Sequence, residues 1–513
     1  MQRALSFLRE AIEAFHRGES AAELARMREP SSDYEPSSAG YALRLLSNQG
    51  SEALAEVRES GELPADEVEW LGRQRAAMRI LLTRSRGERA ARARLSEIET
   101  TTGGTLVLGE EITRIALTAD LRSRNETCRA LETQLRPLAE ARVTAQLKLE
   151  ELAYVDIPRE EPADKDKKEK VAPASFLIVS AFDADVLSPA RRDLAPHAWL
   201  KHAASFLDQT EAAAEDAMRF IVRNVHARSS TGSVPWHTLL SALRAYELDS
   251  EIGRKQRWLR TAGWLRHQGF EEAMSVRLHA EVDQNASLPL GRALAIDVPR
   301  DVRLAQSPRD FGVLSDVAAA EAVARGLSLA LSHVALPPEL RYPLGACVPG
   351  VIGFWGALAW TDREQLTRIQ HLSSTQADRI GRIGRSALLL WARACVSIAL
   401  MPASEPAEPE VRLELLCGAL GRGLCARIEP GIAGVLAPDR LRARALALEA
   451  LCGLAGALAL RERLNADWFR NPRAGDLLRS LAQRGNRLSV EAMCTELDRT
   501  PADAATRAIE LVA

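Results

Sequence analysis

Apolar residues along this chain recur mostly three and four positions apart, the spacing that predicts amphipathic helices. Within residues 1–18 the shared apolar face consists of Leu5, Leu8, Ile12 and Phe15. Because charged residues stand among them from Arg3 onward, this segment is predicted to be a helix of the folded protein and not a signal peptide. Helical patterns continue in the same way to about Asp156 and predict an N-terminal helical bundle.

The clearest boundary in the chain is residues 157–175, which read IPREEPADKDKKEKVAPAS. The segment holds three prolines and a dense run of alternating charge, and such composition is typical of a solvated linker or loop. Its basic cluster, Lys165–Lys170, would suit an acidic partner, although a solvated charge run is the commoner case. The boundary divides the N-terminal bundle, residues 1–156, from a second domain, residues 176–513.

The middle of the chain predicts two buried helices joined at a corner. Asp316–Val334 is a polar-poor helical segment, Ala335–Pro343 is a proline-containing corner, and Leu344–Trp360 is a second apolar segment. Just before them, Leu294–Val298 and Val302–Leu304 have the composition of short strands. The prediction is therefore a mainly α protein with a small β-sheet near residues 293–311.

One stretch, Tyr342–Thr361, is free of charge over twenty residues and is long enough to span a bilayer. It also holds two prolines and four glycines: Pro343, Pro349, Gly345, Gly350, Gly353 and Gly356. Crowded glycines favour close packing against another helix, so the stretch is predicted to be a buried core helix.

Composition excludes some classes of partner. Lys and Arg number 67 against 69 Asp and Glu, which gives a net charge of -2 and no general attraction to nucleic acid or to an anionic membrane. The 7 cysteines are scattered singly, without a CxxC pair. Unpatterned cysteines inside apolar runs indicate reduced thiols, so a cytoplasmic location is expected.

The sequence offers no complete catalytic motif. HExxH, a P-loop and a GxSxG elbow are all missing. His197 and His202 are five positions apart, which places them on different faces of a helix and makes them a poor metal pair. Structural histidines are the simpler interpretation of both.

Three segments resemble the oligoendopeptidase F and thimet-oligopeptidase-like zinc metallopeptidases, and they occur in the order of that family. They are SPRDF (Ser307–Phe311), HVALPPELRYPLG (His333–Gly345) and LNADWFRNPRAGDLLRSL (Leu464–Leu481). The resemblance implies a large, two-lobed, zincin-like helical fold with a peptide groove.

The resemblance also implies that the metal site is lost. The family needs two histidines and a glutamate in HExxH on one helix, and a carboxylate ligand from a later helix. Alignment on the corner places Val323 and Leu327 at the histidine positions and Ala324 at the catalytic glutamate. Gly350 falls near the position of the later carboxylate. We therefore expect no catalytic residue, no bound metal and no cofactor.

The function implied is that of a catalytically inactive metallopeptidase homologue, a pseudopeptidase that binds a peptide or protein and regulates it. His333, Arg341 and Tyr342 are the expected groove residues. One alternative is a helical scaffold whose groove has closed. Another is an active peptidase whose metal ligands the motifs do not reveal.

Overall fold

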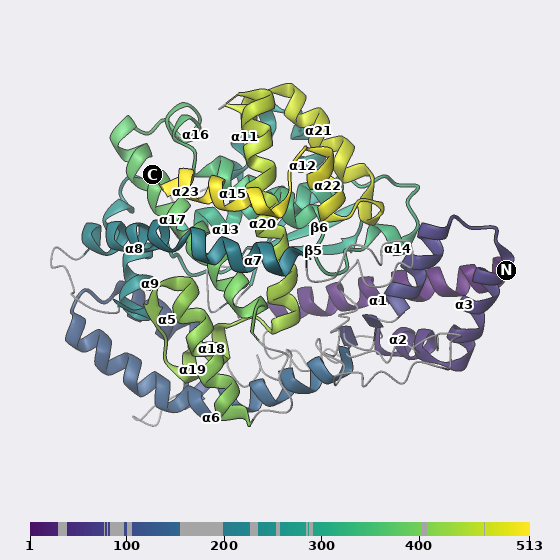
Figure 1. The fold of residues 1–513 in the computed structure, drawn as a ribbon, viewed down its shortest axis with the longest axis horizontal. Helices are drawn as coiled ribbons and strands as arrows, with labels where there is room; N and C mark the ends of the chain where they lie inside the picture. The colour runs from purple at the N-terminus through teal and green to yellow at the C-terminus, as the bar shows by residue number, and fades with distance from the viewer. Residues whose placement is uncertain are drawn as a thin grey trace, which may run out of the picture.

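The computed structural model describes residues 1–28, 38–75, 77–78, 81–82, 97–99, 105–153, 198–225, 234–252, 257–283, 286, 291–401, 408–465 and 467–512. These residues form a mainly helical protein with small sheets, as the sequence predicts (Figure 1). The predicted linker at residues 157–175 lies outside the described residues.

The elements before the centre of the chain are α1 (Gln2–Arg28), α2 (Ser38–Leu46), α3 (Asn48–Ser60), β1 (Glu97–Glu99), β2 (Thr105–Val107), α5 (Leu108–Leu117), α6 (Leu121–Ala153), α7 (Ala198–Gln209), α8 (Glu211–Val225), β3 (Val234–Pro235), α9 (Trp236–Arg244), η2 (Tyr246–Leu248), α10 (Arg257–Thr261), α11 (Gly263–His267), α12 (Glu271–Arg277), β4 (Leu278–Val282), β5 (Arg292–Asp297) and β6 (Asp301–Gln306).

From the centre to the C-terminus they are α13 (Val313–Ala330), α14 (Pro338–Arg341), α15 (Val348–Trp360), α16 (Arg363–Arg368), α17 (Ser374–Ala399), α18 (Pro409–Leu424), β7 (Ala426–Arg427), α19 (Pro430–Leu436), α20 (Arg440–Leu464), η3 (Trp468–Arg470), α21 (Pro472–Gln483), η4 (Gly485–Arg487), α22 (Val490–Glu496), η5 (Pro501–Asp503) and α23 (Ala504–Val512).

Helices α1–α3 form a unit at one end of the molecule, as Figure 1 shows at the right of the view. They share a hydrophobic cluster that is separate from the main core, and the predicted α1 face supplies Leu8, Ile12 and Phe15 to it. Helices α5 and α6 instead pack into the main core, where α6 lies against α19. The buried residues of the segment 1–156 are therefore divided among more than one hydrophobic cluster, and Trp70 and Ala77 join a third one.

Helix α6 runs unbroken through Pro137, although a proline inside a helical pattern predicts an interruption or bend. A proline removes one backbone hydrogen bond and costs about 3 kcal/mol in an isolated helix. Here Leu135 and Ala139 are completely buried on either side of the proline, so tertiary packing keeps the helix continuous.

The predicted sheet is present and has three strands in the order β4-β6-β5. Strands β5 and β6 are the two strands that the sequence predicts, and they pair antiparallel. Strand β4 adds a parallel neighbour to β6 that the sequence does not reveal. A second difference is the antiparallel pair β1-β2, in a region where only helices were predicted. The three missed strands, β1, β2 and β4, are five residues or shorter, too short to establish an alternating pattern.

Helices α13 and α15 are the two buried helices predicted at the centre, joined by the corner that contains α14. They approach closely because α15 presents glycines to α13: a Cβ atom at Gly356 would lie 2.4 Å from the Cβ of Ala324. Glycine removes that clash, so the predicted role of these glycines in helix packing is confirmed. Nearly all of α15 is buried.

Helix α20 packs against α15 and α17 and lies in the core. It is long and apolar enough to cross a membrane by length and composition, yet 83% of its most apolar window is buried inside the protein. A buried core helix passes the same test, so α20 is weak evidence for a membrane segment.

Candidate functional site

The positions aligned with the lost motif lie in the core of the molecule. Val323, Ala324 and Leu327 of α13 are at most 2% exposed, and all three belong to the main hydrophobic cluster. Gly350 lies in the first turn of α15 and is also buried. These side chains offer no group that binds a metal or moves a proton.

A polar cluster nevertheless occupies the space between these helices. Arg325 of α13 donates from Nε to Oε1 of Glu321 at 2.6 Å and from Nη2 to Oε2 of Glu449 at 3.0 Å. Glu449 comes from α20, and its Oε1 accepts from the backbone N–H of Cys347 at 3.1 Å and from the Cys347 thiol at 3.3 Å. One guanidinium thus connects α13 to α20, and Glu449 connects α20 to the start of α15.

The carboxylate of Glu449 fills the place that a side chain at Gly350 would take. A Cβ atom built on Gly350 would lie 1.9 Å from the carboxylate carbon of Glu449. In the resembled family a carboxylate ligand is expected near this position of α15, where this chain has Gly350. The structure supplies one from α20 instead, against the N-terminus of α15, where a helix dipole favours negative charge.

The cluster is deep, but solvent reaches part of it. The side chains of Glu321 and Arg325 are 24% and 23% exposed, while that of Glu449 is 5% exposed. Burial raises the pKa of Glu321, and the positive charge of Arg325 opposes this rise. Burial also lowers the pKa of Arg325, but the carboxylates of Glu321 and Glu449 more than compensate and raise it.

Cys347 is the remaining member of the cluster. Burial, together with the negative charge of Glu449, raises the pKa of its thiol well above the usual range. The thiol therefore stays protonated and donates to Glu449. A thiol in this state is a poor nucleophile, because the thiolate is the reactive form.

The sequence contained signals for this cluster that motif searching missed. Glu321 and Arg325 are four positions apart in an apolar helix, which places them on one face. Glu449 is the lone charge within the apolar run Ala445–Leu460. A charge in a buried helix requires a partner, but the sequence does not reveal which one.

The expected groove residues have different environments. His333 is exposed, and its Nδ1 accepts from the backbone N–H of Ala335 at 3.2 Å. Arg341 donates to the carbonyl of Val298 at 3.0 Å and pairs with Glu13 of α1 at 3.4 Å. Tyr342 is completely buried and therefore not available to a peptide in this structure.

Helix α1 covers Tyr342. The ring of His16 stacks on that of Tyr342, with centroids 4.8 Å apart and planes 3° from parallel. His16 is joined to Gln74 at 3.0 Å, and the amide nitrogen of Asn486 donates to the carbonyl of Tyr342 at 2.7 Å. His16, Gln74 and Asn486, from three separate parts of the chain, therefore pack around the corner between α13 and α15.

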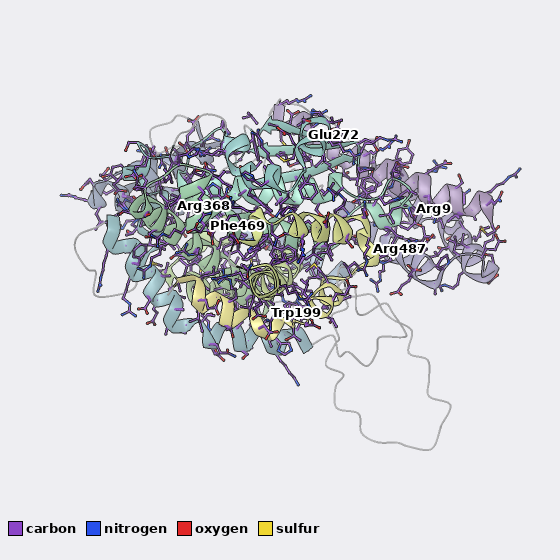
Figure 2. All side chains as sticks on the ribbon, turned by 90° about the horizontal axis from the view of Figure 1, so that it is seen from above. Arg9, Trp199, Glu272, Arg368, Phe469 and Arg487 are labelled. Carbon is purple, nitrogen blue, oxygen red and sulfur yellow. The ribbon has the colours of Figure 1, made fainter. Side chains whose placement is uncertain are left out.

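Ion pairs join the N-terminal helices to the rest of the molecule beside this corner. Arg9 of α1 binds the fully buried carboxylate of Glu339 at 2.8 Å and that of Glu67 at 2.8 Å. Arg487 pairs with the other oxygen of Glu67 at 2.5 Å. Figure 2 shows Arg9 and Arg487 near each other at this junction. The carboxylate of Glu339 on α14 is thus held by α1.

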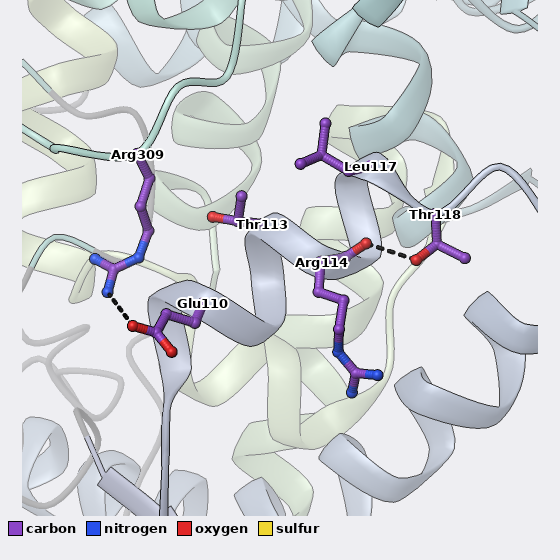
Figure 3. A pocket seen from close by; sticks show the side chains of 6 residues that line it. All are labelled: Glu110, Thr113, Arg114, Leu117, Thr118 and Arg309. Atoms are coloured by element: carbon purple, nitrogen blue, oxygen red, sulfur yellow. Dashed lines mark hydrogen bonds and ion pairs between the residues drawn. The ribbon is translucent and has the colours of Figure 1, made fainter.

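A shallow pocket of about 420 Å³ lies elsewhere, along α5 (Figure 3). Glu110 and Arg309 face each other across it at 3.8 Å. The hydroxyls of Thr113 and Thr118 donate to backbone carbonyls of their own helix at 2.7 Å. The pocket therefore presents few polar groups for a ligand.

Among the residues that the structure describes, no group of three or more His, Cys, Asp or Glu side chains is arranged to hold a metal ion. The polar cluster contains two carboxylates and a thiol, but the guanidinium of Arg325 lies among them. The arrangement can neutralise charge and join helices.

Comparison with solved structures gives the class of fold. The chain is similar to a carboxypeptidase from Pyrococcus furiosus, with a TM-score of 0.57, 11% identity and coverage of 99% of this chain and 98% of that one. It is also similar to metallocarboxypeptidase 1 of Trypanosoma cruzi, with a TM-score of 0.51, 10% identity and coverage of 99% and 98%. A PZ peptidase A bound to an inhibitor gives a TM-score of 0.57, 10% identity and coverage of 99% and 95%.

The fold is therefore metallopeptidase-like over essentially the whole chain, as the sequence predicts. No model of a protein family and no curated protein sequence matches the chain. At identities near 10% the likeness establishes the fold alone. The specific resemblance to oligoendopeptidase F, and the loss of an HExxH motif, stay predictions.

Proposed function

We propose that this protein is a catalytically inactive relative of the metallopeptidases that acts by binding a peptide or a protein and regulating it. The observation that carries the proposal is the ion cluster of Glu321, Arg325 and Glu449. It occupies the space between α13, α15 and α20 with a fixed cation, where the sequence alignment had placed the motif of a metal-dependent enzyme.

Zinc peptidases need three ligands, an open coordination position and a general base. The three positions aligned with the ligands hold valine, leucine and glycine, and the aligned base is alanine. The carboxylates near them are already engaged by Arg325. This chemistry supports the proposed non-catalytic role.

The test is elemental analysis of the purified protein together with hydrolysis of a quenched peptide library. We expect zinc well below one equivalent and no cleavage above that of a buffer control. Stoichiometric zinc accompanied by cleavage would refute the proposal, and it would favour an active peptidase with ligands that motifs do not reveal.

A second candidate is a helical scaffold with a closed groove, which the burial of Tyr342 beneath His16 favours. Fluorescence anisotropy with the same peptide library separates the two candidates. Saturable binding that His333→Ala or Arg341→Ala weakens supports the peptide-binding protein. Lack of binding across the library supports the scaffold.

A further inference from the structure

Helices α8, α17 and α23 pack against one another, at the left of Figure 1. Two contacts show how α8 and α17 run relative to each other. Arg393 of α17 donates to Glu211, the first residue of α8, at 2.6 Å. Earlier in α17, the guanidinium carbon of Arg382 lies 4.0 Å from the centre of the Phe220 ring of α8. The two helices are therefore antiparallel.

Three arginines come together on this face. Arg223 follows Phe220 by about one turn of α8, and Arg379 precedes Arg382 by about one turn of α17. Because the helices are antiparallel, Arg223 and Arg379 lie at the same level, next to Arg382. The arginine face is the name used below for Arg223, Arg379 and Arg382.

The arginine face is not neutralised by the chain itself. None of its three side chains forms a hydrogen bond or an ion pair with the residues that the structure describes, and the Nε atoms of Arg379 and Arg382 are buried without an acceptor. By contrast, Arg219, one turn before Arg223, pairs with Asp216 at 2.9 Å. A buried donor without an acceptor is unfavourable, so an acceptor from outside the chain would be stabilising.

The surroundings add to the positive charge. Burial lowers the pKa of Arg385, which follows Arg382 by about one turn of α17. The carboxylates of Asp362 and Asp378 oppose this shift, and the positive charges of Arg382 and Arg461 add to it. Neighbouring cations that lower the pKa of an arginine indicate a positive local potential, which attracts anionic groups.

Carboxylates suit this surface. A guanidinium binds a carboxylate through paired N–H donors, and Arg382 is already held against Phe220, so little side-chain freedom is lost on binding. Nucleic acid fits less well. The ring of Phe220 lies under Arg382 and offers no stacking surface to a base, and the carboxylate of Asp378 adjoins Arg379 in sequence.

We propose that the arginine face is a docking surface for an acidic segment of a partner protein, whose aspartate or glutamate carboxylates bind Arg223, Arg379 and Arg382. The inference rests on the proposed function and deepens it, because it gives the chemistry of the protein that is bound. The surface lies on α8 and α17, away from the corner that contains α14 (Figure 1), so the two places can be tested separately.

The test measures binding of a fluorescein-labelled oligoglutamate peptide to the full-length protein by fluorescence anisotropy. We expect saturable binding at low salt that weakens as salt is added, because salt screens exposed charges. The double variant Arg379→Gln, Arg382→Gln should bind the peptide about tenfold more weakly. The matched control is Arg122→Gln, Arg129→Gln, which removes the same charge from exposed positions of α6 and should bind as the unaltered protein does.

Four results would overturn the inference. The unaltered protein shows no saturable binding of oligoglutamate, the double variant binds as well as the unaltered protein, or the control variant weakens binding equally. In the fourth, an oligothymidine of the same length binds at least as tightly as oligoglutamate, and the surface is then one for nucleic acid.

Loss of Arg382 also removes its packing on Phe220, so folding of each variant is checked by thermal unfolding. If Arg379→Gln, Arg382→Gln does not fold, Arg223→Gln, Arg379→Gln replaces it, since this pair leaves the contact with Phe220 in place. It should weaken binding to a similar degree, and unchanged binding overturns the inference. The proposed function fails through zinc and cleavage in the unaltered protein, which is a different result, so the two failures are distinguishable.

Discussion

Single residues set the shape of the cluster at the centre of this molecule, and Gly350 is the strictest of them. Its α-carbon faces the carboxylate of Glu449 so closely that a single added methyl group would collide with it. Glu449 has little freedom to move, because Arg325 and the backbone of Cys347 both hold it.

Gly350→Ala is therefore expected to destabilise the protein by about 3 kcal/mol, as forced overpacking does in cores. The measurement is urea unfolding. Gly418→Ala is the matched control, since it lies in helix α18 with nothing within 4 Å of an added Cβ, and it should stabilise the protein by about 0.5–1 kcal/mol. Equal effects of the two substitutions would contradict the close approach.

His16 makes stability depend on pH. Burial lowers its pKa from 6.5 to about 4, although its hydrogen bond with Gln74 opposes the shift. Between these two values the unfolded chain holds a proton that the folded protein does not. The contribution of neutral His16 to the free energy of unfolding is therefore present in full above pH 6.5 and is lost as the pH falls toward 4.

We expect His16→Phe to reduce the loss of stability between pH 6.5 and pH 4 by roughly 2 kcal/mol, while it keeps a ring stacked on Tyr342. Urea unfolding across this range measures the slope. Part of the slope should remain, because burial also lowers the pKa of His237 to about 4. An unchanged slope would mean that His16 is not buried against Tyr342.

At the scale of elements, a buried acidic side chain fixes the start of α13. Asp316 is completely buried, and its Oδ1 accepts from Nε of Arg257 at 2.7 Å and from Nη2 of Arg260 at 2.6 Å. Arg257 also pairs with Asp310 in the loop before the helix. The helix that carries Arg325 is thus held in register with its neighbours by charge.

Asp316→Asn leaves two arginines facing a neutral amide, and we expect a loss of about 3 kcal/mol. Asp378→Asn is the control, since Asp378 and its partner Arg363 are about half exposed at 3.3 Å, and it should change stability by less than about 0.5 kcal/mol. Thermal unfolding of both variants is the measurement. Similar melting temperatures would show that the buried pair does not hold α13.

At the scale of the whole molecule, several ion pairs attach the N-terminal helices to the body, beside the stack of His16 on Tyr342 and a small hydrophobic cluster that contains Trp70 and Leu340. Besides Arg9 with Glu339, Arg17 pairs with Asp297 at 2.5 Å and Arg28 with Glu281 at 2.5 Å. The hydrophobic cluster of α1–α3 is distinct from the main core. High ionic strength should therefore weaken the exposed ion pairs, because salt screens charges that face solvent. The pair between Arg9 and the buried Glu339 should be less sensitive to salt.

Arg9→Leu strands the buried carboxylate of Glu339, so it should cost about 3 kcal/mol and increase hydrogen exchange in α1 and α14. Arg122→Ala is the control, because Arg122 and Glu126 form an exposed pair on α6. Mass-spectrometric hydrogen exchange is the measurement. If both helices keep their protection from hydrogen exchange in Arg9→Leu, the ion pair of Arg9 with Glu339 does not hold α1 against α14.

Much of the fold followed from the sequence, for local physical reasons. The face of α1, the buried helices α13 and α15, and the strands β5 and β6 were predicted, because their apolar spacing or strand composition is strong and local. The metallopeptidase-like class was predicted from three short segments and is supported by the solved structures. The short strands β1, β2 and β4 were missed, since they depend on partners more than on their own pattern.

The candidate site was decided by tertiary structure. The sequence alone places Val323, Ala324 and Leu327 in an apolar helix and so predicts that no motif remains there. It cannot reveal that Glu449, 124 positions beyond Arg325, reaches the space above Gly350. Buried charge must find a partner, but which partner depends on how helices cross, and that is a property of the assembled core.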